Sequence, residues 1–217
     1  MTRQLLVLRP QPGADATAAR AREMGLAAMV SPLFRVAGRE WELPHRPFDG
    51  LLVTSANAAR LLDARLDRGV RVFAVGTATA DAMRAAGFEH VHAGASGVSE
   101  IVREAVAQDV GSLLHLTGED RTPFDPAGIH VETRIVYAAE AIEPGCAFFD
   151  ALSAGAVALL HSARAALRFR ELAGAGHGIA AISPAVLTAA GDGWADSIAA
   201  DQPTDEALLA AAARLCQ

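Results

Sequence analysis

The sequence predicts an α/β protein in which two sets of parallel strands are each covered by helices. Short apolar runs alternate with helical segments along the chain, and this alternation is typical of parallel sheets. Two strand–turn–helix segments recur at one fixed spacing. Apolar residues make up 52% of the 217 residues and charged residues 20%, so the chain can bury a core.

The first elements should be a strand, a helix and a second extended segment. Gln4–Leu8 (QLLVL) is a short apolar run, which predicts a buried parallel strand. Asp15–Met24 has helical character and Gly25 ends it. Ala27–Val36 is extended, and Pro32 inside it favours a position near a sheet edge.

The rest of the chain continues this alternation. In order, we expect the strand Gly50–Val53, a turn at Thr54–Asn57 that caps a helix through about Leu66, the strand Val70–Val75, a turn at Gly76–Thr79 that opens a helix ending at Gly87, a helix capped within Ser96–Glu100, the strand Leu113–Leu116, the extended run Val131–Ala139, the strands Val157–Leu160 and Ile179–Ile182, each followed by a helix, and a last helix capped by Thr204.

The two halves of the chain also repeat one another. GLLVTSANAA and VALLHSARAA align Ser55 with Ser162, while FAVGTATA and AAISPAVL align Gly76 with Ser183, and both offsets are 107. LLVLRP near the start aligns with LLHLTG, which pairs Leu8 with Leu116 at an offset of 108. An unchanged offset across two separate elements favours two copies of one unit, and two such domains create a cleft where a ligand can bind.

Charge and residue usage exclude several functions. The net charge is −6 and no Lys/Arg-rich run occurs, so we expect neither a nucleic acid nor a membrane partner. All 19 basic residues are Arg, which excludes a Schiff-base lysine, a pyridoxal phosphate attachment and a phosphate-loop lysine. The planar guanidinium fork suits carboxylate recognition.

We expect no cofactor and no metal site. Cys146 and Cys216 are too few for a disulfide framework or a zinc site, and His90 and His92 have no third ligand at a sensible spacing. The segment Met1–Pro10 lacks the apolar stretch of a signal peptide. We therefore expect a cytoplasmic protein, and we expect it to be a monomer.

Small and hydroxyl-bearing residues gather where the predicted strands end. Ligands of open parallel sheets bind beyond these carboxyl ends, and the free N–H groups of a helix start attract anions. Several such turns could bind a molecule with many carboxylates, although each hydroxyl could equally be an ordinary helix cap. The candidate binding residues are Arg9, Thr54, Ser55, Ala56, Gly76, Thr79, Gly118, Ser162 and Ser183.

The order and spacing of these pieces resemble the uroporphyrinogen-III synthase family over nearly the whole chain. The matching pieces are LLVLRP, FDGLLVTSANAAR, VFAVGTATADAMRAAGF, LLHLTGEDR, RIVYAAEA, VALLHSARAALRF, IAAISPAV and DQPTDEALLAAA. The resemblance implies two flavodoxin-like domains joined by a two-stranded linker. One domain would hold residues 1–36 plus 142–217 and the other residues 40–134, with linker strands at about 35–39 and 134–140.

The resemblance also implies the reaction. Such an enzyme, a hydro-lyase of heme biosynthesis, takes hydroxymethylbilane, removes its terminal hydroxyl as water and closes the tetrapyrrole with ring D inverted. Positioning of a flexible substrate would supply most of the catalysis. Tyr137, the only tyrosine, would be the general acid for the departing hydroxyl, because a phenol is protonated at neutral pH. A packing role for Tyr137 stays open.

The same resemblance implies how substrate carboxylates are bound. Thr79, Ser55 and Ser162 would anchor them together with turn amides, and Arg9 would be a further partner. The family often has Gly and Thr in the second copy of its GxxT turn, where this chain has Ser183 and Val186, so backbone contacts must serve there. A non-catalytic binder of a small polycarboxylate, with the same cleft and caps, remains the alternative.

Overall fold

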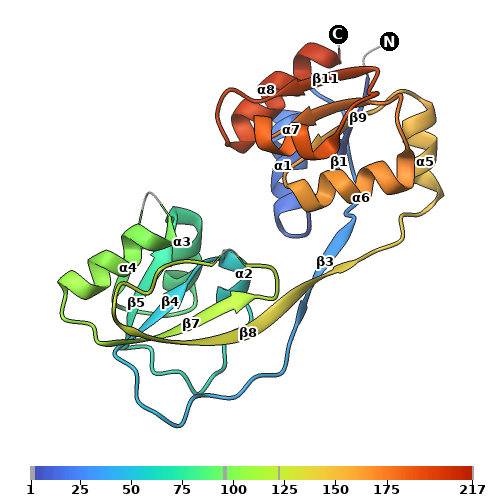
Figure 1. Cartoon of the computed structure of the whole chain (residues 1–217). Coiled ribbons are helices and arrows are strands. Elements are labelled where there is room, and N and C mark those ends of the chain that lie inside the picture. The colour runs from blue at the N-terminus through green and yellow to red at the C-terminus, as the bar shows by residue number, and fades with distance from the viewer. Residues whose placement is uncertain (1–2, 95–96, 122, 217) are drawn as a thin grey trace. The chain divides into compact units, whose positions relative to one another are not determined.

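The computed structural model describes residues 3–94, 97–121 and 123–216. The chain forms two compact units, shown in Figure 1. Unit 1 consists of residues 1–35 and 140–217, and unit 2 of residues 36–139. The chain leaves unit 1 within strand β3 (Phe34–Gly38) and returns within β8 (His130–Ala141), and these two strands are neighbours in one sheet.

Unit 1 is built on a five-stranded parallel sheet with the order β11-β10-β9-β1-β2. From its other edge this is the 2-1-3-4-5 order of flavodoxin-like folds, so the predicted class is confirmed. The strands are β1 (Leu5–Val7), β2 (Ala28–Val30), β9 (Val157–Leu160), β10 (Gly178–Ala181) and β11 (Asp196–Ala199). The helices are α1 (Gly13–Glu23), α5 (Cys146–Ser153), α6 (Ala163–Ala173), α7 (Pro184–Ala190) and α8 (Asp205–Leu215).

Helices cover both faces of this sheet. Ala18 of α1 and Leu209 of α8 pack with Val7 and Leu159 in one fully buried cluster. Helices α6 and α7 pack against each other, and Phe148 of α5 lies edge-on to Phe169 of α6 at 6.1 Å between ring centres. Strands β1 and β9 are therefore buried on both faces, which explains their uninterrupted apolar runs.

Unit 2 contains the second sheet, whose order is β3-β8-β7-β4-β5-β6. The ladders from β8 through β6 are all parallel. In addition to β3 and β8, the sheet contains β4 (Gly50–Val53), β5 (Arg71–Val75), β6 (Val91–Gly94) and β7 (Ser112–Gly118). The helices of unit 2 are α2 (Ala56–Ala59), α3 (Thr77–Ala85) and α4 (Val98–Ala107). Read from β6 the parallel strands have the 3-2-1-4-5 order of doubly wound folds.

The internal repeat is confirmed by the two sheets. Strands β6-β5-β4-β7-β8 of unit 2 occupy the same sequence of positions as β11-β10-β9-β1-β2 of unit 1. The aligned residues also share their local roles: Ser55 and Ser162 are the N-caps of α2 and α6, while Gly76 and Ser183 are the N-caps of α3 and α7. Each unit is thus one copy of the same sheet.

Several local predictions need correction. The helix expected to reach Leu66 is wrong, because α2 ends at Ala59. Beyond it the Asp63 carboxylate accepts a hydrogen bond from the backbone N–H of Arg65 at 2.8 Å, which favours a turn. Strands β6 and β11 and helix α5 were not predicted. The N-cap of helix α4 is Gly97, which lies within the predicted capping segment Ser96–Glu100, and Ser96 itself lies outside the described residues.

Candidate functional site

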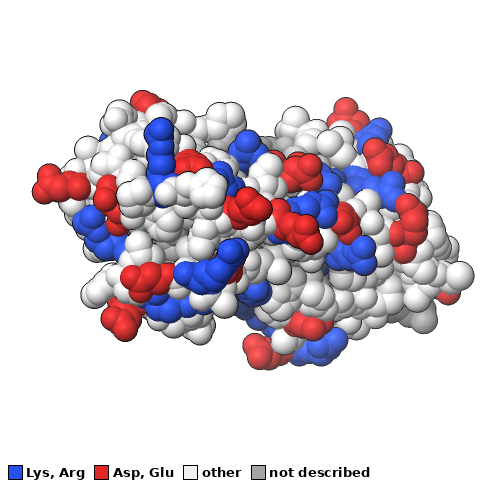
Figure 2. All heavy atoms as spheres, turned by 90° about the horizontal axis from the view of Figure 1, so that it is seen from below, with Lys and Arg blue, Asp and Glu red and all other residues white. Residues whose placement is uncertain are grey.

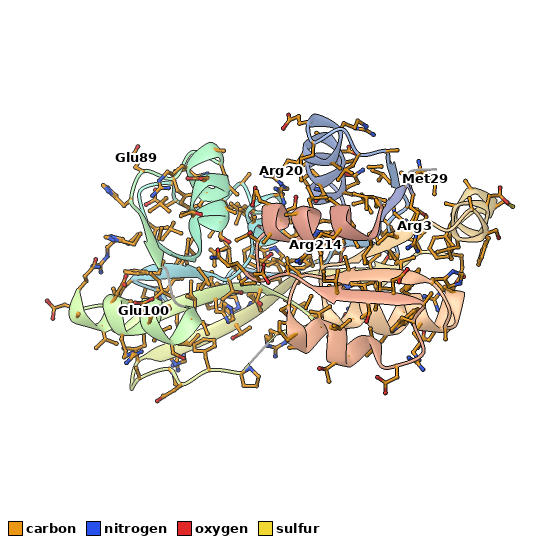
Figure 3. All side chains as sticks on the ribbon, turned by 90° about the horizontal axis from the view of Figure 1, so that it is seen from above. Arg3, Arg20, Met29, Glu89, Glu100 and Arg214 are labelled. Carbon is orange, nitrogen blue, oxygen red and sulfur yellow. The ribbon has the colours of Figure 1, made fainter. Side chains whose placement is uncertain are left out.

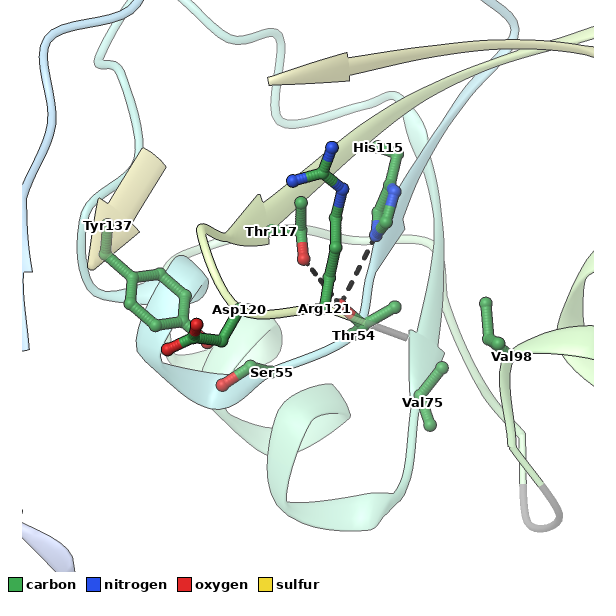
Figure 4. Close-up of a pocket in the computed structure, with 9 residues that line it drawn as sticks. All are labelled: Thr54, Ser55, Val75, Val98, His115, Thr117, Asp120, Arg121 and Tyr137. Carbon is green, nitrogen blue, oxygen red and sulfur yellow. Dashed lines mark hydrogen bonds between the residues drawn. The ribbon is translucent and has the colours of Figure 1, made fainter. Parts of the chain in front are cut away.

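A polar pocket of about 250 Å³ lies in unit 2 beyond the ends of β4 and β7 (Figure 4). The strand order of this sheet reverses between β4 and β7, and ligands of doubly wound sheets bind in the crevice at such a switch point. The lining residues are Thr54, Ser55, Val75, Val98, His115, Thr117, Asp120, Arg121 and Tyr137. The pocket therefore stands where this topology favours ligand binding.

Three polar side chains meet at the inner wall of the pocket. Oγ1 of Thr54, just after β4, lies 3.3 Å from Nε2 of His115 and 3.3 Å from Oγ1 of Thr117. His115 and Thr117 are two residues apart on β7, so their side chains leave the strand on the same face, and both are buried. These groups form a hydrogen-bonding surface at the switch point.

The imidazole of His115 is neutral at physiological pH. Burial, and after it the positive charge of Arg121, lower the pKa of His115 to about 4. Phe124 lies edge-on to the imidazole at 5.3 Å between ring centres, which adds an apolar wall. His115 can therefore donate or accept a hydrogen bond here, but Arg121 is the cation that the pocket offers to an anion.

Tyr137 on β8 lies over Gly118 on β7. The two residues are paired across the parallel ladder, at an irregularity between Thr117 and Gly118. A Cβ atom at Gly118 would lie 2.6 Å from Cζ and 2.9 Å from the hydroxyl oxygen of Tyr137. Figure 4 shows the phenol ring pointing from β8 toward Asp120 and Ser55. Only glycine at this position leaves room for the ring at the pocket.

Comparison with known proteins assigns the family. A family model described as uroporphyrinogen-III synthase HemD matches residues 15–210, which is most of the chain. The chain belongs to the uroporphyrinogen-III synthase family. The resemblance first seen in the sequence motifs is therefore confirmed.

Individual relatives agree with this family. A "Putative uroporphyrinogen-III synthase" of Archaeoglobus fulgidus is 37% identical over 82 residues, which are 38% of this chain and 35% of that protein. The match thus spans about a third of the archaeal relative. The crystal structure of uroporphyrinogen-III synthetase from Helicobacter pylori 26695 is similar with a TM-score of 0.66 at 17% identity, covering 97% of each chain.

A second solved structure shares the fold. A mutant uroporphyrinogen III synthase from the extremely thermophilic bacterium Thermus thermophilus is similar with a TM-score of 0.50 and 17% identity, and the match covers 97% of this chain and 96% of that one. At such identities the two structures show that the fold of the uroporphyrinogen-III synthase family extends over both units of this chain.

The structure brings together some of the residues that the sequence predicted for a uroporphyrinogen-III synthase site. Thr54, Ser55 and Tyr137 line the pocket, and Gly118 lies beneath the Tyr137 ring. The Ser55 hydroxyl accepts a hydrogen bond from the backbone N–H of Asn57 at 3.2 Å, so it also caps α2. Ser55 therefore caps α2 and also lines the pocket, and its role in substrate binding stays a prediction.

Other predicted residues of unit 2 are not at the pocket. Ala56 is the first residue of α2, and Gly76, with a φ of 79°, is the N-cap of α3. The Thr79 side chain lies on α3 and is only 5% exposed. The described lining of the pocket includes none of these three residues. A carboxylate contact through the Thr79 hydroxyl would need this side chain to become more exposed.

The predicted residues of unit 1 have partners within their own chain. Ser162 accepts from the backbone N–H of Ala165 at 3.2 Å, and Ser183 accepts from that of Val186 at 3.3 Å, so both cap helices. The guanidinium of Arg9 contacts the Asp205 carboxylate at 3.4 Å. These residues lie after the strand ends, as the sequence predicted, but the two serines also have the ordinary cap role.

Sequence reasoning did not select four polar residues of the pocket wall: His115, Thr117, Asp120 and Arg121. The segment LLHLTGEDR contains all of them. The signal that could have found the first two is a pair of polar residues alternating within an otherwise apolar strand, because polar side chains buried in a sheet need partners. Asp120 and Arg121 follow on a loop, where exposed charges are common.

The described residues contain no group of three or more His, Cys, Asp or Glu side chains arranged to hold a metal ion. Within the same part of the chain, the helices are all too short or too polar to cross a membrane. On the face drawn in Figure 2, Arg side chains are interspersed with Asp and Glu. On this face the positive charge therefore comes from individual Arg side chains placed among acidic ones.

Proposed function

We propose that this protein is a uroporphyrinogen-III synthase, which closes hydroxymethylbilane into uroporphyrinogen III with inversion of ring D and loss of water. The observation that carries the proposal is the family match over residues 15–210, together with a polar pocket at the switch point of unit 2 that contains Tyr137. This activity would make the protein a hydro-lyase of heme biosynthesis.

The pocket contains groups suited to the first step of this reaction. The terminal hydroxyl of hydroxymethylbilane leaves as water when it receives a proton, and the electron pair of the adjacent pyrrole nitrogen stabilises the resulting cation. The Tyr137 hydroxyl lies at the pocket and can donate that proton. Figure 4 draws the Asp120 carboxylate in the direction in which the phenol points, where it could stabilise developing positive charge.

Carboxylate recognition would come from the same wall. Every pyrrole of the substrate carries two carboxylate side chains, and Arg121 provides a guanidinium at the pocket. The hydroxyls of Thr54 and Thr117 and the neutral imidazole of His115 can hydrogen-bond a carboxylate or a pyrrole N–H. Selective binding of one ring in this way would hold the flexible chain in the geometry that favours inversion.

A pocket of about 250 Å³ is too small for a whole tetrapyrrole. The remaining rings need other contacts, for which the proposal uses the helix starts predicted from the sequence. Ser162 and Ser183 lie at the N-termini of α6 and α7, where backbone N–H groups and the helix dipole favour anions. Arg9, which the sequence predicted as a further partner, is paired with the Asp205 carboxylate, so the proposal assigns it no substrate carboxylate.

The test is an assay with hydroxymethylbilane and purified protein, with no metal or cofactor added. The proposal predicts consumption faster than the spontaneous reaction and a type III product. A non-catalytic binder would return the spontaneous rate and the type I isomer. A cytoplasmic location and a monomeric state stay predictions, which localisation of a fluorescent fusion and size-exclusion chromatography check.

The role of Tyr137 is tested separately. The Tyr137→Phe variant should fold normally and turn over about ten to a hundred times more slowly, which is the range for loss of a general acid. The matched control is Ser55→Ala at the same pocket, which should have a mild effect because backbone N–H groups remain. Full turnover by a folded Tyr137→Phe variant would leave Tyr137 a packing residue.

A further inference from the structure

The crevice of unit 1 that corresponds to the pocket of unit 2 holds a carboxylate of the chain itself. Strands β9 and β1 match β4 and β7, so the ends of β9 and β1 form the switch point of unit 1. His161 comes directly after β9, as Thr54 comes directly after β4. Arg9 comes shortly after β1 and aligns with Thr117 near the end of β7. Asp205, the first residue of α8, extends its carboxylate to His161 and Arg9.

Four side chains surround this carboxylate. Oδ1 of Asp205 lies 2.8 Å from Nε2 of His161, 2.8 Å from Oγ1 of Thr17 and 3.4 Å from a terminal nitrogen of Arg9. Oδ2 lies 2.7 Å from a terminal nitrogen of Arg20. Thr17 and Arg20 belong to α1, which packs beside α8, and Figure 3 shows Arg20 near that helix. The donors come from three separate parts of the chain.

The cluster has the burial and charge of a binding site for one anion. The side chain of Asp205 is 9% exposed and that of His161 is 7% exposed. Burial alone would raise the pKa of Asp205, but hydrogen bonds from His161, Thr17 and Arg20 outweigh it and hold the pKa far below its usual range. The ring of donors therefore selects a carboxylate in its charged form.

His161 shows that the site is organised around this carboxylate. Its Nδ1 atom is buried and, in the described structure, has no hydrogen-bond partner. The ring is therefore oriented from one side only, by the Nε2 contact to Asp205, and Nε2 carries the proton because a carboxylate accepts. Loss of the carboxylate would leave a buried imidazole without its partner, and an external acceptor of the same shape could replace it.

We propose that the crevice of unit 1 is a carboxylate-binding site whose ligand is the chain's own Asp205, and that this residue keeps external carboxylates away from Arg9, Thr17 and His161. Of the two matching crevices, only that of unit 2 then presents its cation, Arg121, to a substrate carboxylate. This last consequence rests on the proposed function, whereas the binding site itself does not.

The experiment removes the resident carboxylate and offers it back as a free ion. Asp205→Ala lacks a group of the size of formate, and Asp205→Gly lacks one of the size of acetate. Each variant is made in a Trp41→Phe background, so that the fluorescence of Trp194 reports the thermal unfolding of unit 1. Melting is compared in sodium formate, sodium acetate and sodium chloride at equal ionic strength, about 0.2 M.

The variants should melt at lower temperature than the parent in chloride and recover with the matching ion. At ten times its dissociation constant, formate should raise the midpoint of Asp205→Ala by about 3–5 °C. Acetate should be the better ion for Asp205→Gly. The parent, the exposed control Asp201→Ala, and Asp205→Asn, whose amide still fills the space, should show no difference between the salts.

Equal midpoints in all three salts for both Asp205→Ala and Asp205→Gly would overturn the proposal. The same effect of formate on Asp205→Asn would also overturn it, because the ion would then act without entering the vacated site. If a variant does not fold in chloride, recovery of its circular dichroism in the matching ion supports the site, and failure of both variants to fold in any salt refutes it. These readouts involve no turnover, so they stand whether or not the proposed function holds.

Discussion

Replacing Gly118 with alanine tests how the pocket holds Tyr137. The new Cβ atom would lie 2.6 Å from Cζ of Tyr137, and ordinary contact begins near 3.4 Å, so the ring must move by about 0.8 Å. Gly118 is not among the glycines with a positive φ, so alanine suits its backbone. The half-buried ring can move toward solvent, and the substitution therefore changes the ring position with little other change.

The expected effects differ strongly between stability and activity. Overpacking costs about 1–3 kcal/mol where neighbours cannot move, so a ring that can move should leave the free energy of unfolding lower by about 1 kcal/mol. Misplacement of a catalytic group by about 1 Å can cost a hundredfold in rate. Gly118→Ala should therefore lower turnover of hydroxymethylbilane by about ten- to a hundredfold, similar to Tyr137→Phe.

The assay compares Gly118→Ala, Tyr137→Phe and the double variant, with urea unfolding as the stability measurement. The double variant should be no slower than Tyr137→Phe, because both changes act through one hydroxyl. The matched control is Gly111→Ala on the approach to the same strand, where a Cβ would meet only Asp49 Oδ2 at 3.5 Å. Multiplied losses in the double variant would refute the positioning role and favour a separate contact of Gly118 with substrate.

Three further predictions concern stability. The folded-state pKa of His115 is about 4, below the ordinary value, so as pH falls through about 6.5 only the unfolded chain gains a proton at this residue. In urea unfolding, the free energy of unfolding of the parent should therefore fall by about 2 kcal/mol between pH 8 and pH 5, and His115→Gln should not show this loss. Because the pKa of Asp205 is lowered, its carboxylate stabilises the folded protein above the ordinary carboxyl pKa, and this contribution is lost as pH falls below that value. Asp205→Asn should therefore be less stable than the parent by about 2–4 kcal/mol at pH 7, and the difference should shrink only below about pH 4. Residues 36–139, expressed alone, should form a cooperatively folded domain, because the buried clusters around Val53 and Phe73 lie within them. Amide hydrogen exchange checks this, and a disordered fragment would contradict it.

The parts of the fold that follow from local sequence were predictable. Val157–Leu160 is apolar throughout because β9 is buried on both faces, and Ser162 directly after it is a helix cap. The edge strands β6 and β11 were missed, because Val91–Gly94 and Asp196–Ala199 mix polar and small residues and have only one neighbour each. These two edge strands therefore lack the apolar signal that identified the central strands.

The candidate site was only partly predictable for a related reason. Thr54 and Ser55 were found because they directly follow a recognisable strand. His115 was missed, since a histidine inside an apolar run reveals its environment only when the neighbouring strand is known. The carboxylate site of unit 1 joins Asp205 to Arg9, nearly two hundred residues away, and only the strand order places them together.

The most direct test of the proposed function is the isomer composition of the product as a function of protein concentration. Hydroxymethylbilane closes spontaneously to the type I ring, so each reaction contains its own internal reference. The proposed function predicts that the type III fraction rises with added protein until it dominates, and that Tyr137→Phe needs about ten to a hundred times more protein for the same fraction. A product that stays type I at every protein concentration would contradict the assignment of this activity to the chain.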